Sequence, residues 1–219
     1  MVTVDTLKKD ETVRIYITEA DASLAALGYT EHSFAHVGAV ADRAASLLSW
    51  LGYDKRTVEL AEIAGYLHDI GNVVNRVDHS QSGALIAFRI LDKYGMDAAE
   101  IAKIVTAIGN HDEGTGVPVN AIAAALILAD KSDVRRTRVR NNDFSTFDIH
   151  DRVNYSAVKS HLVLSEDKSR VTLELEIDTD ISAIMDYFEI FLGRMKLCRR
   201  AASRLGVSFK LCINDQQFI

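Results

Sequence analysis

The sequence predicts a mainly α protein with a small C-terminal α+β appendage. A single proline among 219 residues, together with many Ala, Leu and Ile residues, favours uninterrupted helices. Several long segments carry apolar residues at helical spacing, and most of them lie before residue 131. The pattern changes to alternation after Tyr155, which is typical of half-buried strands. Strands should therefore be a minority and should lie near the C-terminus.

Six helices are expected in the first part of the chain, and most of them carry recognisable end signals. They occupy, in order, residues 10–27, 32–51, 55–70, 79–94, 98–109 and 120–130. Asp54, Asp78 and Asp97 are placed to cap three of the starts, and Pro118 suits the first turn of the last helix. Gly71 is expected to end the third helix in a left-handed conformation. The last helix is apolar on nearly every side, so it should be central.

The C-terminal part reads as a small α+β unit. Residues 135–150 are polar and should form a loop or a weak helix. Two alternating segments, 158–164 and 171–177, predict a hairpin. A long helix over 181–205 and a last strand in "VSFKLCI" follow. We therefore expect a helical domain at 1–150 and a subdomain at 151–219 with three short strands and one long helix.

Composition and charge restrict the class of function. The formal net charge of -6 argues against binding an extended nucleic acid, and it favours a small-molecule partner. The longest apolar run, residues 121–129, is too short to span a bilayer. Cys198 and Cys212 lack zinc-ribbon spacing, so packed thiols are expected. We expect a cytoplasmic protein that does not act in a membrane, and a homodimer is possible.

Two aspartates at helix ends indicate a bound cation. Asp130 ends the almost wholly apolar helix, where an ionised carboxylate costs several kcal/mol unless a cation or strong donors meet it. Asp69 poses the same problem, and His68 beside it offers a nitrogen ligand. A bound divalent metal would neutralise both carboxylates and use the histidine nitrogen as a ligand. The alternative is a structural salt bridge from Asp130 to Lys131 or Arg135.

Three further histidines lie on inward faces or near helix ends. His36 lies on an apolar helical face, His79 at a helix start and His111 just after a helix end. Taken singly, each has a simpler interpretation, because a lone buried histidine is more often packed and hydrogen-bonded than a ligand. The combination favours a metal site: a His, then an adjacent His-Asp, then an Asp, each on a separate helix.

These residues resemble the signature of the HD-domain phosphohydrolase superfamily. The segments "HVGAVADRAASLL", "AEIAGYLHDIGN" and "ILADKSD" look like its motifs, over about residues 31–133. The resemblance implies an HD-domain helical bundle that binds one divalent ion, with Asp69 and His68 at the catalytic centre. The implied ligands of that ion are His36, His68, Asp69 and Asp130. Because "DHSQSGA" and "GNHDEG" resemble the added histidine segments of bimetallic branches, His79 and His111 would hold a second ion, with Asp69 bridging.

Four histidines and two aspartates form a mixed nitrogen and oxygen set. Such a set suits one or two divalent transition-metal ions, Fe, Mn, Co, Ni or Zn, better than a site for magnesium alone. His32 precedes His36 by four residues and could form a metal pair with it. The apolar pattern fits the family motif when it is counted from His36. We therefore expect His32 to be a helix-start residue or a neighbour of the ligands.

The candidate substrate-binding residues are cationic or polar. In related phosphodiesterases a lysine often follows the HDIG run, and here Asn72 takes its place, with Arg76 four residues on as a substitute charge. A basic run follows Asp130, and in it Lys131 and Arg135 should share a helix face. Arginine and lysine there could bind phosphate. The alternative is a solvated helix end, where cations favour the helix dipole.

Three function classes remain open from the sequence. The first is a metal-dependent phosphohydrolase that cleaves a phosphoester or phosphoanhydride of a nucleotide or another small phosphorylated compound by metal-activated water. The second is a di-iron oxygenase, because members of the superfamily that resemble myo-inositol oxygenase use the same ligand set. The third is a noncatalytic regulatory module that the metal stabilises. We favour the first class, an enzyme.

Overall fold

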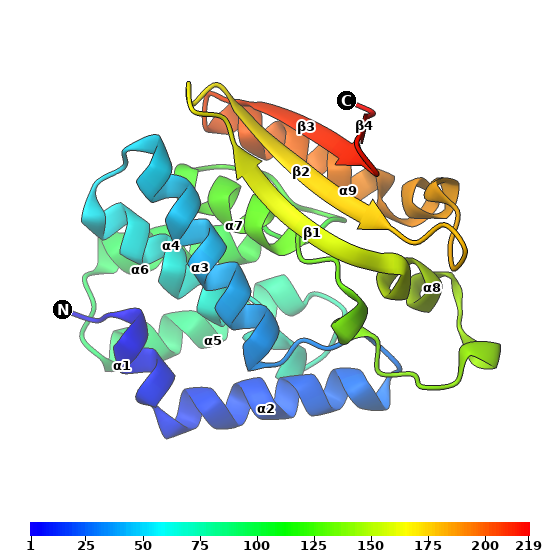
Figure 1. The fold of residues 1–219 in the computed structure, drawn as a ribbon. Coiled ribbons are helices and arrows are strands. Elements are labelled where there is room, and N and C mark those ends of the chain that lie inside the picture. Colours follow the sequence, from blue (N-terminus) through cyan, green and yellow to red (C-terminus); the bar gives the residue numbers. More distant parts are fainter.

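The computed structural model describes residues 1–219. Helices dominate the chain, and all the strands lie in its C-terminal third (Figure 1). The elements, in order, are α1 (Val4–Lys9), α2 (Glu11–Ala26), α3 (Phe34–Leu51), α4 (Lys55–Leu67), η1 (Ile70–Val73), α5 (His79–Lys93), α6 (Ala98–Gly109), α7 (Ala121–Lys131), η2 (Arg136–Arg138), η3 (Phe144–Thr146), α8 (Ile149–Ser156), β1 (Ala157–Leu164), β2 (Arg170–Ile177), α9 (Ile184–Arg204), β3 (Ser208–Ile213) and β4 (Gln216–Gln217). The predicted fold class is confirmed.

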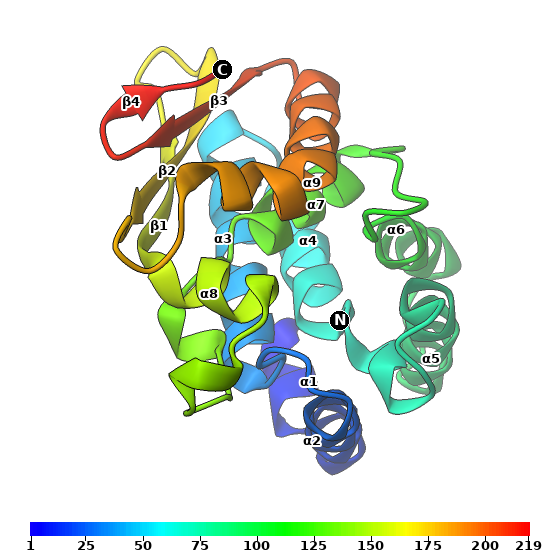
Figure 2. The ribbon, with the colours of Figure 1, turned by 90° about the vertical axis from the view of Figure 1, so that its right-hand side faces the viewer.

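Helix α7 is the centre of the molecule, as its all-round apolar sequence predicts. Every residue from 122 to 131 is buried, and the helix packs on α3, α4, α6 and α9. The sheet lies along one side of the helices, with α9 between it and α7 (Figure 2). A charged side chain at the end of α7 is therefore held deep among helices.

The sheet has the strand order β1-β2-β3-β4. The predicted hairpin β1–β2 is antiparallel, and β3 pairs parallel with β2 after the α9 crossover. A fourth strand, β4, was missed in the expectation of three. Asn214 and Asp215 both have positive φ, a backbone geometry that Asn and Asp adopt more readily than most residues, and this two-residue turn folds the chain end back onto β3.

The predicted helix starts are partly confirmed. The side chains of Asp54 and Asp97 accept backbone N–H bonds from the first turns of α4 and α6. Asp78 precedes α5, but it has a φ of 56° and its side chain makes no cap hydrogen bond. Pro118 lies outside α7, because Asn120 caps that helix instead. The first helix, α1, was not expected at all, since six residues are too few to show periodicity.

The expected left-handed terminator at Gly71 is wrong. Gly71 has no positive φ and lies inside η1. A Cβ on this glycine would come within 3.0 Å of the His79 carbonyl oxygen and the Gly83 amide nitrogen. Glycine is therefore required because the backbones of η1 and α5 touch here. This contact brings the segment after His68 and Asp69 against the start of α5.

We expect Gly71→Ala to destabilise the protein by about 3 kcal/mol or more, because the added methyl group meets two backbone atoms that cannot rotate away. The measurement is urea unfolding of the variant and the wild type. Gly38→Ala in α3 is the matched control, since a Cβ there has no atom within 4 Å and alanine favours helix. Equal unfolding free energies for the two variants would contradict the proposed close approach.

One hydrophobic core runs through both predicted parts of the chain. Its 53 buried residues include Leu126 of α7 as well as Tyr187 and Phe191 of α9. The boundary near residue 150 remains a prediction, and α9 packs directly on α7 across it. No helix is both long and apolar enough to cross a membrane.

Candidate metal centre

Four side chains from three helical segments form a first cluster. His36 comes from α3, His68 and Asp69 from the end of α4, and Asp130 from the last turn of α7, and all four are buried. The Nε2 atom of His36 lies 3.5 Å from Asp69 Oδ2 and 3.5 Å from Asp130 Oδ1. The Nε2 atom of His68 lies 3.3 and 3.7 Å from the same two oxygens. Two imidazole nitrogens and two carboxylate oxygens thus face one point.

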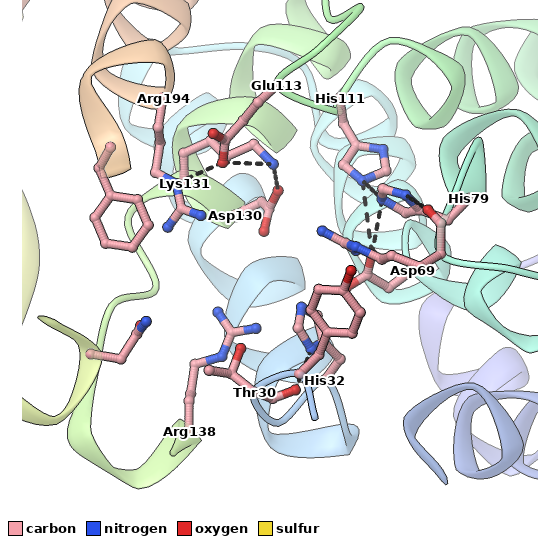
Figure 3. Close-up of a pocket in the computed structure, with 14 residues that line it drawn as sticks. Thr30, His32, Asp69, His79, His111, Glu113, Asp130, Lys131, Arg138 and Arg194 are labelled. Atoms are coloured by element: carbon pink, nitrogen blue, oxygen red, sulfur yellow. Dashed lines mark hydrogen bonds and ion pairs between the residues drawn. The ribbon is translucent and has the colours of Figure 1, made fainter. Parts of the chain in front are cut away.

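The other carboxylate oxygen of Asp69 faces a second cluster. Asp69 Oδ1 lies 3.6 Å from His79 Nε2 and 3.8 Å from His111 Nε2. The two histidine Nε2 atoms are 3.2 Å apart. Figure 3 shows His79 and His111 converging on Asp69 from the α5 and α6 side of the pocket. Asp69 therefore stands between the clusters with one oxygen toward each.

The histidine hydrogen bonds orient all four Nε2 atoms inward. Each Nδ1 faces an oxygen at 2.6–3.0 Å; the oxygens belong to Asp133 for His36, and to the carbonyls of Gly65, Arg76 and Ile108 for His68, His79 and His111. A carbonyl only accepts, so Nδ1 carries the proton and the neutral ring offers a lone pair at Nε2. His36 Nε2 and His68 Nε2 are buried without a hydrogen-bond partner.

These features fit a divalent metal. Most of the nitrogen–oxygen separations exceed a normal hydrogen bond. They approach the ligand–ligand edges of about 3.0–3.6 Å expected around an ion with bonds of about 2.0–2.2 Å. Two overlapping sets have their ligand atoms close enough to hold an ion: His36, His68 and Asp130, and His68, Asp69 and His111. The residues present therefore fit a divalent metal site.

The charges of the protein without metal differ between the two clusters. Burial alone would lower the pKa of His68, but the carboxylates of Asp69 and Asp130 outweigh it and raise the pKa to about 10. Burial lowers the pKa of His79 to about 4, against the opposing effect of Asp69. Burial also disfavours ionised Asp69, but the imidazoles that face it, His68 above all, hold its pKa well below the usual range. Without metal, the first cluster therefore favours the protonated form of its histidine, and the second cluster favours the neutral form of His79.

Asp133 is a buried anchor that the sequence reasoning did not select. Its side chain is fully buried, and Oδ2 accepts from His36 Nδ1 at 2.8 Å. Its Oδ1 accepts from Arg43 and Arg135, each at 3.1 Å, and its main-chain carbonyl accepts from Arg138. A carboxylate behind a ligand histidine fixes the ring and raises its basicity. The signal was present, since this aspartate follows the end of α7 by two residues within "ILADKSD".

Asn72 and Arg76, two of the predicted substrate-binding residues, differ in position. Asn72 is buried and its amide donates to the Asp69 main-chain carbonyl at 2.9 Å and to Asp69 Oδ1 at 3.2 Å, so it holds this aspartate. Arg76 lines the cavity, with its guanidinium carbon 5.5 Å from the centre of the Tyr29 ring. Of these two residues, only Arg76 lines the cavity.

Lys131 and Arg135 do not share a helix face, because α7 ends at Lys131 and Arg135 is extended. Lys131 lines the cavity and its Nζ donates to Asp130 Oδ2 at 2.5 Å. Arg135 is absent from the cavity lining and pairs with Glu31 and Asp133 instead. The lysine thus faces the cavity, and the arginine serves the packing of the loop.

The clusters open into a cavity of about 120 Å³ with an almost wholly polar lining. Its charged residues are Arg76, Lys131, Arg138 and Arg194, and Asp69, Glu113 and Asp130. His32 also lines it, and its Nδ1 lies 2.6 Å from the Thr30 carbonyl. Arg194 and Glu113 could not be found from sequence, because no local pattern places α9 beside the loop after α6. The cavity next to the metal-ligand candidates is therefore lined by four cationic and three anionic side chains.

Comparison with known proteins agrees with this geometry. The profile of the HD domain family matches residues 33–189, which is more than half of the chain. The chain therefore belongs to the HD domain family, whose members are generally metal-dependent phosphohydrolases. It is also 27% identical over 159 residues to the uncharacterized protein MJ1020 of Methanocaldococcus jannaschii, a match that covers 62% of this chain and 61% of that protein.

If His79 and His111 hold a second ion, replacing His79 with alanine should lower the metal content from about two ions per chain to about one. The fold should remain, and the loss should fall mainly on kcat, since the second ion stabilises charge that develops in the transition state. Metal analysis with steady-state kinetics measures both. His32→Ala, at a neighbouring histidine outside the two clusters, should leave the metal content unchanged. A wild type that binds one ion under metal-replete conditions would contradict the two-ion arrangement.

Proposed function

We propose that the protein is a metal-dependent phosphohydrolase that cleaves a phosphoester or phosphoanhydride of a small phosphorylated compound such as a nucleotide. The observation that carries the proposal is the position of Asp69. Each of its carboxylate oxygens faces a separate pair of histidine Nε2 atoms, beside a cationic cavity. This arrangement supports two neighbouring ions that share one carboxylate.

The residues that would hold the ions are His36, His68, Asp69, His79, His111 and Asp130. When bound, a pair of divalent ions lowers the pKa of water and stabilises charge on the phosphorus oxygens. Lys131 holds one oxygen of Asp130, so the other stays turned toward His36 and His68. The Asn72 amide donates to Asp69 Oδ1, the oxygen that faces His79 and His111, and so fixes this carboxylate. These hydrogen bonds therefore hold the metal-binding side chains in position before any substrate binds.

The cavity favours a phosphoryl group over a larger moiety. A volume of about 120 Å³ is well below that of the pockets that enclose whole drug-sized ligands, about 300–1,000 Å³. The phosphoryl group can enter while the rest of the substrate stays outside. Lys131 and the arginines offer N–H donors to phosphate oxygens there. This geometry explains how one site could serve a nucleotide or another phosphorylated compound.

The test is release of inorganic phosphate from a panel of p-nitrophenyl phosphate and nucleoside mono-, di- and triphosphates. The protein is stripped of metal and reconstituted in turn with Mn, Fe, Co, Ni and Zn. We expect release with at least one metal and none from the stripped protein. Oxygen uptake by the iron form without phosphate release would replace this proposal with an oxygenase. Metal binding with no turnover of any kind would support a regulatory module.

A further inference from the structure

Two arginines from distant segments face each other across the cavity. Arg138 belongs to η2 and is only 5% exposed, and Arg194 belongs to α9 in the C-terminal part of the chain. Figure 3 shows both guanidinium groups pointing inward, from opposite sides, toward the region in front of Asp130. Neither residue belongs to the two histidine clusters.

The hydrogen bonds of these arginines leave donors unused. Arg138 donates from Nε to the Glu31 carbonyl and from Nη1 to the Asp133 carbonyl, each at 2.8 Å, and its Nη2 has no acceptor. Arg194 donates from Nε to Glu113 Oε1 at 2.8 Å, and neither of its Nη atoms has an acceptor. At least three guanidinium N–H-bearing nitrogens therefore remain free around one cavity.

The nearby carboxylates are already engaged. Asp130 accepts from Lys131, and Glu113 accepts from Arg194 and lies 4.0 Å from Lys131 Nζ. Burial lowers the pKa of Arg138, and the like charge of Arg194 lowers it further. The nearby aspartates act in the opposite direction and raise it. Buried cations that face each other are stabilised by an anion between them. Arg138 Nη1 lies 3.7 Å from Asp133 Oδ2 and Arg194 Nε pairs with Glu113, so the donors left for a ligand are the three guanidinium nitrogens that have no acceptor.

We propose that Arg138 and Arg194 form an anion subsite that binds a terminal, doubly charged phosphoryl group in front of Asp130. This inference rests on the proposed function, because the phosphoryl group is that of the substrate. Two guanidinium groups can each donate to a tetrahedral oxygen pair, and a small cavity suits a terminal group better than a phosphodiester with substituents on both sides.

The subsite makes α9 part of the active site. A continuous chain of contacts runs from Asp130 through Lys131 and Glu113 to Arg194. Arg194 also stacks on Phe191, with its guanidinium carbon 3.9 Å from the ring centre. This stacking and the Glu113 contact fix the guanidinium before a ligand arrives. The C-terminal segment thereby contributes a binding residue that the HD signature itself lacks.

The test of the subsite is to measure the affinity for inorganic phosphate by calorimetry. The full chain is used, once with metal and once without it. Arg194→Gln should weaken phosphate binding about 10- to 100-fold in both forms, as the loss of charge-assisted hydrogen bonds predicts. Arg194→Lys should restore part of it. Arg194 is the better choice for substitution, because Arg138 also holds two backbone carbonyls. Arg200→Gln on the same helix is the control, since Arg200 donates to the Gly116 carbonyl and does not line the cavity.

Phosphate binding by Arg194→Gln within twofold of the wild type, with metal content and thermal unfolding unchanged, would overturn the subsite. Acetate binding as tight as phosphate binding would overturn its assignment to a phosphoryl group. Hydrolysis of phosphodiesters as fast as monoesters would do the same while leaving the proposed function standing. Arg194-dependent phosphate binding in a protein that hydrolyses nothing would keep the subsite and refute only the proposed function.

Discussion

The Asp69→Ala variant is expected to lose both ions and all measurable turnover. Asp69 is the one side chain whose oxygens face both histidine clusters, so its removal takes a ligand from each. We expect the metal content to fall from about two ions per chain to nearly none, and kcat/KM to fall at least about 10³-fold. Metal analysis of the purified variant and a phosphate-release assay measure these two losses.

The control for this variant is Asp92→Ala, which removes an exposed carboxylate on α5 that makes no side-chain hydrogen bond or ion pair. It should keep the metal content and activity of the wild type. Loss of one ion with the other retained in Asp69→Ala would show that the aspartate serves a single site. Full retention of metal would contradict its role as a ligand.

The second large effect is expected at Asp133. Its side chain is fully buried, and its loss would remove the carboxylate partner of Arg43 and of the His36 ring, and one of the two partners of Arg135. We expect Asp133→Ala to destabilise the protein by about 3–5 kcal/mol, as for other buried pairs broken on one side. Metal affinity should also fall about 10- to 100-fold, because His36 is no longer held.

Urea unfolding of the metal-free protein and metal titration measure the two consequences of Asp133→Ala separately. Glu176→Ala is the matched comparison, because it breaks a carboxylate–lysine pair with Lys159 in which both side chains are exposed. That variant should lose less than about 1 kcal/mol and bind metal normally. Equal stability and equal metal affinity of the two variants would contradict the role of Asp133 as a buried partner that holds His36.

Local patterns explain why the helical core and the His, His-Asp, Asp series could be predicted. Apolar periodicity places His36 on an inward face, and the uninterrupted apolar run before Asp130 puts this aspartate at the end of a buried helix. Both features depend only on residues that are close in sequence. The same holds for the hairpin of β1 and β2, because apolar and polar residues alternate along both segments.

The features that were missed depend on contacts between distant segments. Gly71 is required by the backbone of α5, and a sequence shows only that a helix stops near it. Arg135 lies in a run of basic residues that by composition could bind phosphate. In the structure it pairs instead with Glu31, which lies more than a hundred residues away in the sequence. Arg194 reaches the cavity only because α9 packs on α7. Tertiary packing decides such positions, and charge or glycine content alone does not.

The most direct test of a two-ion phosphohydrolase is to titrate the metal-stripped protein with a divalent ion while phosphate release is recorded. The geometry of Asp69 between two histidine pairs predicts no turnover at the start and a plateau near about two equivalents per chain. Phosphate release that is unchanged by stripping the metal, or that never responds to added ion, would contradict the account.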